Sequence, residues 1–590
     1  MALCSGIVDD LQRRSPHYLS DWHYVDFDCS LKILSASFYM FFNSLAPAIT
    51  FGMLLSDSTR YQMGVLEVLM ATSIGGCAFS IFAGQPLVIV GVTGPITILT
   101  ISMFELSKNW DIAFLPFYAW SQLFAALMHI FIAMFNLCDL IKHVTRFSCE
   151  TFGVLIAIVF IYEGVKGISG YFSNITVETM SGVYLQLIIA LATIYLSLLL
   201  LGAPNWLFFT ATVRGTIKDY GVTLAVIFSS AIAYMGDNIS VSIQKLVTPN
   251  SFGTTTPRSW LVDMGDLPVW AIFVSIIPGF IITILFAFDH NISSLMAQAP
   301  EYRLKKGSYF HYDFLVLGLC LVVTGKCVDL IILYDHVISM NNIGVLGLPP
   351  VSGMIPHSFL HTKSLIRVIT TSQTLNVELV VRVVGDEEAV NNVDSTVVCD
   401  DQAAERSLHG EDDSLENEPD ASSILPVNVP TDPARITHIL YEQRLSNLAQ
   451  SVLIGLMCFA PFIRYLQYIP RCVLDGLFVI LGVLSFEGNQ FFSRLVYVLC
   501  DSSCGHRYAD NCECGFLHCL NYETVARFTA MQLLVCLAIF GVTFTPAVII
   551  FPVLISVLVP LRLYVLPKYF DVNFLHTMDP LTESAEELVS

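Results

Sequence analysis

The stretch Gly84-Gln-Pro-Leu-Val-Ile-Val-Gly-Val-Thr-Gly-Pro-Ile-Thr-Ile-Leu-Thr100 is apolar but too interrupted to form one continuous membrane helix. The β-branched run 88–92 predicts extended chain. Thr93, Gly94 and Pro95 then predict a helix start, with a hydroxyl near the N-cap and proline in the first turn. A helix that begins inside a membrane points unpaired N–H groups and a positive dipole end at whatever precedes it. In inverted-repeat transporters such broken segments form the substrate site. A kinked structural helix is the alternative.

The composition is that of a polytopic membrane protein. Hydrophobic residues make up 55% of the chain and charged residues 13%, and the mean hydropathy is +0.67, far from the balance of a soluble domain. Runs of about twenty apolar residues, the length of a spanning helix, recur along the chain. We therefore predict an all-α polytopic membrane fold. The net charge of −20 is concentrated in one loop, so it says little about a transported species.

Apolar runs predict the positions of the spans, and short basic loops predict their orientation. Basic residues follow the fourth and eighth spans, which places the N-terminus in the cytoplasm. Asn174 and Asn238 lie in sequons after the fifth and seventh spans, so both are predicted outside as candidate glycosylation sites. The first eight spans are expected at about 32–55, 63–82, 87–105, 111–137, 148–168, 181–201, 220–236 and 268–290.

A second interrupted segment, Leu346-Gly-Leu-Pro-Pro-Val-Ser-Gly-Met-Ile-Pro-His357, lies in the other half of the chain. Its prolines and glycines cannot continue a helix, but they fit an extended stretch followed by a half-helix toward His361 and Lys363. One interrupted segment in each half indicates an inverted-repeat transporter. No residue-level repeat links the halves, so the topological pairing carries this interpretation.

A third element is the apolar segment Phe286-Ala-Phe-Asp-His-Asn-Ile-Ser-Ser-Leu-Met-Ala-Gln298. Its Asp289 is costly in a span unless it has a partner or a task. Facing two half-helix N-termini, the carboxylate can hold a proton, a cation or a hydroxyl-bearing substrate. A carboxylate solvated at the end of the helix is the alternative. His290 is next in sequence and therefore on another helical face, so we assign it no role.

These segments and several further motifs resemble the eukaryotic borate transporters, a branch of the bicarbonate/anion-exchanger superfamily. The resemblance covers roughly residues 15–570, and the motifs occur in the right order. The further motifs are Phe310-His-Tyr-Asp-Phe, His361-Thr-Lys-Ser-Leu, Glu442-Gln-Arg-Leu-Ser-Asn-Leu, Gly488-Asn-Gln-Phe, Phe551-Pro-Val-Leu-Ile and Leu566-Pro-Lys-Tyr-Phe.

The resemblance implies fourteen membrane segments in two inverted repeats of seven, with a core and a gate domain that move in an elevator-like manner, commonly in a dimer. It also implies a substrate site between the third, eighth and tenth segments, with Asp289 as its acidic residue. The expected substrate-binding residues are Gln85, Thr93, Gly94, Pro95, Asp289, Ser293, Ser352 and Gly353.

The expected domain organisation follows from the spans and the resemblance. It comprises a cytoplasmic N-terminus (1–31), the core domain (32–137, 268–365 and a last span at 446–468), the gate domain (148–236, 470–488 and 526–565), an acidic disordered cytoplasmic loop (366–436), a Cys/His-rich connector (489–524) and a C-terminal tail (570–590). The acidic loop is interpreted as a linker, because dense Asp and Glu with few aromatic residues favour disorder; a regulatory segment is the alternative.

Two departures from the family pattern affect the site. Borate members usually have Asn where this chain has Ser352, and the shorter side chain with one donor is expected to change affinity or selectivity. The family also passes almost directly from the ninth span to the second interrupted segment, whereas here residues 326–343 intervene. This insertion is too short for a clean extra pair of spans. It is interpreted as a re-entrant excursion, a segment that abolishes transport, or a mispredicted or alternatively spliced segment.

The connector 489–524 contains clustered thiols and imidazoles of irregular spacing. We interpret it as a reduced, surface-lying connector, because no standard zinc-finger spacing is present; a tetrahedral zinc set is the alternative. That set would be drawn from Cys500, Cys504, His506, Cys512 and Cys514.

The resemblance implies efflux of borate or boric acid across the plasma membrane, with the coupling ion, proton or hydroxide, left open. The anion-exchanging relatives carry a basic side chain on the tenth segment, and Val351-Ser-Gly has none, which favours the borate branch. The closest alternative is a bicarbonate or other anion exchanger, and an alternative of another class is a transport-inactive sensor or scaffold. No nucleophile–base pair, phosphate loop or dinucleotide fingerprint occurs. We therefore expect no enzyme, cofactor or nucleic-acid partner; the expected partners are the substrate, the lipid bilayer and a second copy of the chain.

Overall fold

The computed structural model separates the chain into two compact units. One comprises Met1–Leu365 and Leu440–Ser590, and the other comprises Ile366–Ile439. β5 (Ile366–Thr371) and β6 (Arg435–Leu440), which belong to the second unit except for the last residue of β6, form a two-stranded sheet. The described residues are 3–23, 27–173, 180–235, 243–246, 248–249, 251–298, 302, 304, 306, 308–326, 344–371, 435–486, 488–500 and 520–579.

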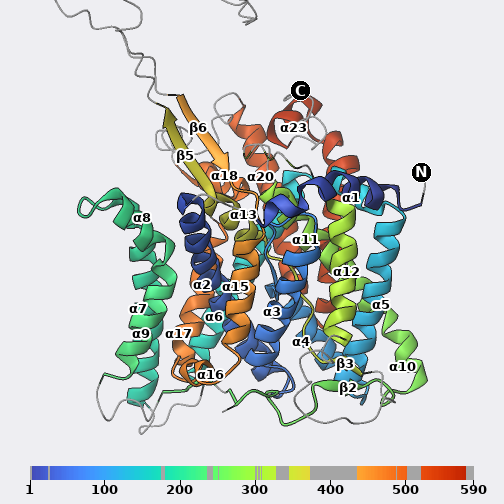
Figure 1. Ribbon diagram of the computed structural model, residues 1–590, viewed down its shortest axis with the longest axis vertical. Coiled ribbons are helices and arrows are strands. Elements are labelled where there is room, and N and C mark those ends of the chain that lie inside the picture. The colour runs from blue at the N-terminus through green and yellow to red at the C-terminus, as the bar shows by residue number, and fades with distance from the viewer. Residues whose placement is uncertain are drawn as a thin grey trace, which may run out of the picture. The chain divides into compact units, whose positions relative to one another are not determined.

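The first unit is built almost entirely of helices that run side by side (Figure 1). Its first half contains α1 (Ser5–Tyr18), η1 (Leu19–Asp21), α2 (Phe27–Ser58), α3 (Val65–Phe82), β1 (Val90–Gly91), α4 (Gly94–Asn109), α5 (Phe114–Met134), η2 (Leu137–His143), α6 (Arg146–Gly170), α7 (Met180–Leu201), η3 (Ala203–Asn205), α8 (Ala211–Asp219) and α9 (Gly221–Ala233).

The described part of the second half also consists mostly of helices, with three short strands. It contains β2 (Leu261–Asp263), α10 (Val269–Val274), α11 (Ile276–Ala297), α12 (Phe310–Lys326), β3 (Gly344–Leu346), β4 (Ser352–Gly353), α13 (Ile355–Ser364), α15 (Leu445–Leu456), α16 (Phe462–Leu466), α17 (Arg471–Leu484), α18 (Gln490–Leu499), α20 (Tyr522–Val542), η7 (Pro546–Ile550), α21 (Phe551–Ser556), α22 (Leu558–Pro560), η8 (Leu561–Val565), η9 (Leu566–Lys568) and α23 (Val572–Met578).

Eight helices among the described residues are long and apolar enough to cross a membrane. A ninth crossing is present if α8 and α9, bent by 69° at their junction, are one broken span. Helices α12 and α15 are apolar but shorter. The predicted polytopic helical membrane fold is therefore confirmed.

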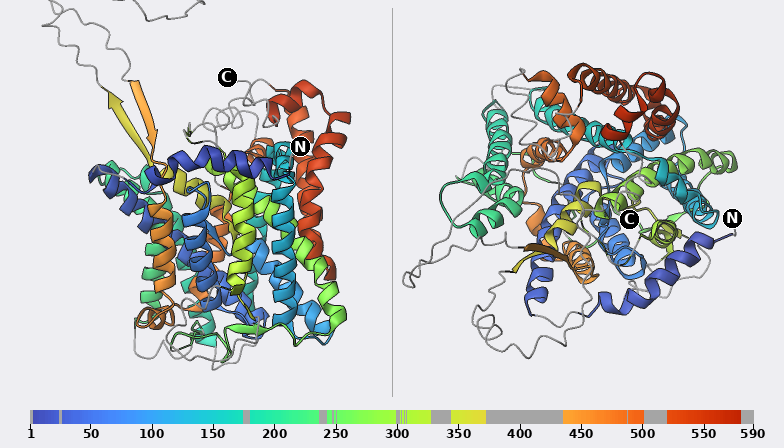
Figure 2. Two further views of the ribbon diagram at one scale, coloured as in Figure 1. Left: turned by 45° about the vertical axis from the view of Figure 1, so that its right-hand side comes forward. Right: turned by 90° about the horizontal axis from the view of Figure 1, so that it is seen from above.

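Helix contacts divide the first unit into two groups. In the first group, α3 packs against α2, α12 and α15, while α11 packs against α5 and α13. In the second, α17 packs against α6 and α7, α7 against α9, and α6 against α20. In the view from above in Figure 2, the teal helices α7–α9 lie to the left of the blue and green helices of the first group. Both interrupted segments belong to the first group.

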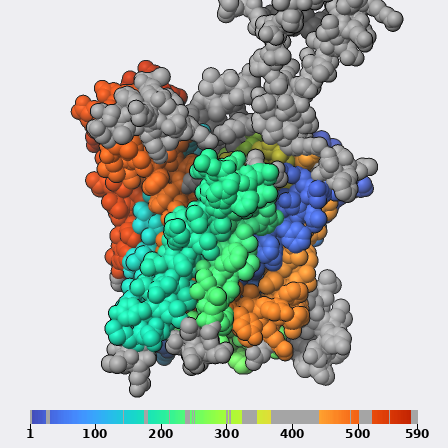
Figure 3. Space-filling model, turned by 90° about the vertical axis from the view of Figure 1, so that its left-hand side faces the viewer, coloured from blue at the N-terminus to red at the C-terminus, as the bar shows by residue number. Residues whose placement is uncertain are grey.

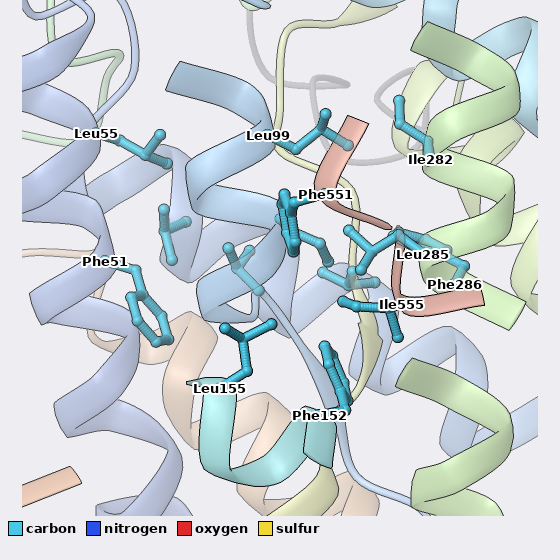
Figure 4. Packing of buried hydrophobic residues seen from close by; sticks show 14 of the residues in the cluster. Phe51, Leu55, Leu99, Phe152, Leu155, Ile282, Leu285, Phe286, Phe551 and Ile555 are labelled. Carbon is cyan, nitrogen blue, oxygen red and sulfur yellow. The ribbon is translucent and has the colours of Figure 1, made fainter. Parts of the chain in front are cut away.

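A layer of buried apolar side chains lies where the two groups meet (Figure 4). On the side of the first group it contains residues of α2, α4 and α11, and on the side of the second group residues of α6. Residues of α21, which packs against α11, complete it. The labelled members are Phe51, Leu55, Leu99, Ile282, Leu285, Phe286, Phe152, Leu155, Phe551 and Ile555.

The outer helices present large apolar side chains on their free faces. Figure 3 shows the teal surface of α7–α9 facing the viewer, and α7 exposes Ile188 and Tyr195 by 59% and 68%. A soluble protein rarely exposes a continuous apolar face of this kind, whereas a bilayer solvates it. These faces are consistent with a surface in contact with lipid.

Two predicted boundaries were wrong. The eighth span was expected to end at 290, but α11 continues to Ala297, so Asp289 lies inside the helix and not at its end. The span expected at 446–468 is interrupted, because α15 ends at Leu456 and the short α16 follows it. The pattern of apolar residues did not predict the end of α11, because polar residues continue that helix. It did not predict the break after α15 either, because the residues of the turn there are apolar.

Several sequence predictions lie outside the described residues. They concern Asn174 and Asn238, insertion residues 327–343, most of the acidic loop, and connector residues 501–519, which include Cys504, His506, Cys512 and Cys514. The first part of the connector is described and forms α18, whose Phe491, Arg494 and Tyr497 are buried. Within the described part of the chain, no group of three or more His, Cys, Asp or Glu side chains is arranged to hold a metal.

Candidate substrate site

The two interrupted segments meet as a short antiparallel pair of strands. Val90 of β1 lies opposite Gly353 of β4, and Gly91 lies opposite Ser352. Just beyond the pair, the Met354 N–H donates to the Ile89 carbonyl at 2.8 Å. The predicted extended chain before each half-helix is thus confirmed, and the pairing explains how two non-helical stretches satisfy backbone groups inside a helical bundle.

Each strand leads directly into a half-helix. α4 begins at Gly94 after an extended Thr93, and α13 begins at Ile355 after an extended Met354. Proline occupies the first turn of both helices, where a missing N–H costs nothing. Two helix N-termini with their partial positive charge therefore begin next to the strand pair.

Asp289 of α11 is joined to the start of α4. The Thr93 hydroxyl donates to Asp289 Oδ2 at 2.9 Å, and Asp289 is 2% exposed. A buried carboxylate is costly unless it is hydrogen-bonded or paired, and this hydroxyl is its hydrogen-bond partner among the described contacts. The alternative of a carboxylate solvated at a helix end is therefore wrong.

Helices α11 and α6 pack closely against the site at two glycines, Gly353 and Gly94. A Cβ on Gly353 would lie 2.9 Å from Ser293 Cβ and 3.1 Å from His290 Cα. A Cβ on Gly94 would overlap the ring of Phe160 on α6. At Gly353 the approach of α11 leaves no room for a side chain, whereas at Gly94 the Phe160 ring would have to shift to admit one.

The buried serine hydroxyl groups at the site differ in whether they have a hydrogen-bond partner. The Ser293 hydroxyl is hydrogen-bonded to the Ser358 hydroxyl at 2.6 Å, and Ser358 also accepts the Ile89 N–H at 3.0 Å. The Ser352 hydroxyl is fully buried and has no protein partner. Because buried polar atoms are normally satisfied, Ser352 offers a free donor and acceptor beside the strand pair.

Gln85 lies apart from this constellation. Its N–H donates to Asp313 of α12, at 3.2 Å to Oδ2, and its side-chain oxygen accepts the Leu87 N–H at 3.3 Å. No described hydrogen bond joins Gln85 to Thr93, Asp289 or Ser352. The structure thus brings Thr93, Gly94, Pro95, Asp289, Ser293, Ser352 and Gly353 together and places Gln85 at the start of the extended stretch.

Residues 84–92 form the extended stretch before α4, which we call the arm, and they are held by side chains to which the sequence pattern gave no role. Asn447 donates to the Pro86 and Val88 carbonyls at 3.1 and 2.8 Å. His361 lies between the Leu87 carbonyl and the Ser446 hydroxyl, at 2.8 and 2.6 Å. His361, Asn447 and Asp313 all stand in motifs that carried the family resemblance, and the available signal was a buried polar residue in an apolar segment.

His290 was assigned no role, and it remains outside the hydrogen-bonded constellation. It is fully buried, neither ring nitrogen has a protein partner, and its ring packs edge-on against Phe79 with centroids 5.3 Å apart. The neighbouring carboxylate of Asp289 bonds Thr93 instead.

The comparisons with known proteins agree with the membrane fold. The family model of the HCO3− transporter integral membrane domain matches residues 2–185, 176–385 and 427–583. The chain belongs to the HCO3− transporter family. Among similar proteins, Boron transporter 4 of Arabidopsis thaliana is 31% identical to the chain, and the match covers 98% of the chain and 87% of the relative. Boron transporter 1 of Saccharomyces cerevisiae is 29% identical, covering 96% and 85%.

Among solved structures, the transmembrane domain of the cyanobacterium bicarbonate transporter BicA matches with a TM-score of 0.47 at 12% sequence identity. The match covers 85% of this chain and 96% of that domain.

Proposed function

We propose that this chain exports borate or boric acid across the plasma membrane by alternating access. Members of the same family named as boron transporters match nearly its whole length. The single observation that carries the proposal is the Thr93–Asp289 hydrogen bond at 2.9 Å, because it ties a buried carboxylate to the start of a half-helix beside the strand pair.

The groups at this position suit a polyhydroxy boron species. Borate is a tetrahedral anion whose hydroxyl groups both donate and accept hydrogen bonds. Its charge is favoured by the N-termini of α4 and α13, while Asp289 accepts from substrate hydroxyl groups and the free Ser352 hydroxyl does either. Ser293 and Gly353 shape the wall between α11 and β4.

The movement proposed is a displacement of a core domain against a gate domain. The first helix group would form the core and the second the gate, within fourteen segments in two inverted repeats of seven. The antiparallel β1–β4 pair supports opposite orientation of the repeats. The apolar layer in Figure 4 supports sliding, since apolar side chains have no directional bonds to break. Residence in the plasma membrane, a cytoplasmic N-terminus and a homodimer belong to the same proposal.

The test is boron content and growth of boron-sensitive yeast that express the chain. The wild-type chain is expected to lower cell boron and confer tolerance, and Asp289→Asn is expected to do neither at equal surface abundance. A chain without residues 326–343 belongs beside them. If only that shortened chain exports, the fold assignment holds and the insertion blocks transport.

A bicarbonate or other anion exchanger is the second candidate, because the matching family model is that of HCO3− transporters. It predicts chloride- or bicarbonate-dependent flux with no change in boron content. A chain that reaches the surface and carries neither boron nor bicarbonate would instead support the sensor or scaffold alternative.

A further inference from the structure

The start of the arm is held by two charged residues from distant parts of the chain. The Gly84 N–H donates to Asp313 Oδ1 at 2.5 Å. The Gly84 carbonyl accepts from Arg444 Nη2 at 3.5 Å. The arm has no helical ladder, so its backbone groups depend on side chains such as these.

Arg444 also fixes the end of the preceding helix. Its Nη1 donates to the Ser80 carbonyl at 2.8 Å and to the Ile81 carbonyl at 3.4 Å. These are carbonyl groups of the last turn of α3, which have no partner within the helix. One fully buried guanidinium therefore joins the end of α3 to the first residue of the arm.

Arg444 is held in turn by the N-terminal segment. Its Nε donates to Asp21 Oδ2 at 3.1 Å, and its backbone N–H donates to the Asp21 carbonyl at 3.3 Å. Asp21, in η1 directly after α1, is fully buried. Lys306 donates to Asp21 Oδ1 at 2.6 Å, and Arg14 of α1 forms an ion pair with the same carboxylate. Three cations from three parts of the chain share this one carboxylate.

We propose that Asp21 acts through Arg444 as a positioning residue for the arm, so that the N-terminal segment 5–21 is a working part of the substrate site. Removing the Asp21 charge leaves Arg14, Lys306 and Arg444 close together in a buried place, where like charges repel and the three cations have lost the carboxylate that they share. Arg444 then withdraws from the Gly84 carbonyl and the arm loosens. The weaker substrate binding that follows rests on the proposed function; the loosening of the arm does not.

The first test is hydrogen exchange of the purified full-length protein, read on peptides that cover residues 84–92. Asp21→Asn is expected to speed exchange of these amides roughly tenfold, because the arm opens more often. The matched control is Asp579→Asn, which removes an equally buried carboxylate paired with Arg562 in the C-terminal part of the chain. The control is expected to leave exchange at 84–92 unchanged. Unchanged exchange in Asp21→Asn, or equal acceleration in both variants, overturns the proposal.

A second variant, at Arg444, keeps the positive charge and removes only the forked guanidinium group. Arg444→Lys retains a cation for Asp21, but a single ammonium does not reach both Ser80 and Gly84. Arg444→Lys is expected to speed amide exchange at 84–92 as well. Asp21→Glu, which keeps a carboxylate, is expected to exchange at the wild-type rate. If amide exchange at 84–92 is as slow in Arg444→Lys as in the wild type, the proposal that Asp21 acts through Arg444 is contradicted. This result is decisive even if the Asp21→Asn protein cannot be produced.

Transport kinetics provide the functional readout. Boron efflux at equal surface abundance is expected to show a KM raised severalfold in Asp21→Asn, and an unchanged KM in Asp579→Asn. Faster exchange with no boron transport in any variant, the wild type included, refutes the proposed function and leaves the positioning role intact. Faster exchange with an unchanged KM in a transporting protein refutes the link to substrate binding.

Discussion

The Thr93 hydroxyl, at the start of half-helix α4, donates to Asp289 of α11 across 2.9 Å. The two residues lie 196 positions apart in the chain, so the bond links an interrupted segment of the first half to a helix of the second. The bond holds the carboxylate against Thr93, which follows β1 and precedes the first residue of α4. The carboxylate therefore lies next to the N-terminus of α4.

Replacing Asp289 is expected to abolish boron export while leaving folding and surface delivery largely intact. Asp289→Asn keeps the shape and an acceptor for Thr93, but it removes the charge and with it the ability to accept from several substrate hydroxyl groups. Asp289→Ala removes both. The measurement is boron efflux normalised to surface abundance; export at the wild-type rate in both variants contradicts the role of Asp289.

Replacing Thr93 separates the hydroxyl from the shape of the side chain. Thr93→Val is isosteric but loses a hydrogen bond to a charged group, which is worth about 1.5–3 kcal/mol. If this bond orients Asp289 when substrate is bound, its loss corresponds to roughly a tenfold to hundredfold weaker substrate affinity. Thr93→Ser keeps the hydroxyl and serves as the matched control, with an affinity close to wild type. Efflux measured over a range of boron concentrations distinguishes them, and equal affinities in Val and Ser variants would show that the bond is not used.

Gly353 should tolerate no side chain, because a Cβ would lie 2.9 Å from Ser293 Cβ. Gly353→Ala is expected to destabilise the protein by about 1–3 kcal/mol, the usual cost of overpacking. Gly541→Ala, where nothing lies within 4 Å of the added Cβ, is the control and should leave the thermal midpoint unchanged or higher. Adding Ser293→Gly to Gly353→Ala should recover part of the loss in the purified protein.

Both interrupted segments could be predicted from the sequence, because proline, glycine and β-branched residues act locally on the backbone. Thr93 and Asp289 were predicted as members of one site, which the resemblance places between the third, eighth and tenth segments. The hydrogen bond between them was not predicted, since apolar periodicity carries no information on which helices meet. The anchors of the arm were missed for the same reason. Asp313 and Arg444 reach Gly84 across 229 and 360 positions, and each looks in sequence like an isolated charge near a helix start.

The free hydroxyl of Ser352 leads to an unusual expectation. Since it has no protein partner, Ser352→Ala should cost almost no stability, yet it should raise the KM for boron because the substrate loses a hydrogen bond. Ser358→Ala is the contrasting variant, because it removes a hydroxyl that bonds Ile89 and Ser293. It should lower the free energy of unfolding by about 1–3 kcal/mol. Thermal unfolding and efflux measured side by side test the contrast, and a stability loss in Ser352→Ala would refute it.

The ion pair between Asp57 and Arg471 offers a direct test of movement between the two helix groups. Asp57 lies in the last turn of α2 in the first group, and Arg471 is the first residue of α17 in the second. The charged atoms are 2.7 Å apart, and both side chains are about one-third exposed. A displacement of one group against the other must separate them. Joining Asp57→Cys to Arg471→Cys with a short cross-linker that forms a disulfide with each thiol should therefore arrest boron efflux. Reducing these disulfides should release the linker and restore efflux. Each single cysteine variant treated with the same reagent is the control, since it carries the modification without the link. Undiminished efflux in a fully cross-linked protein would mean that transport proceeds without relative movement at this interface.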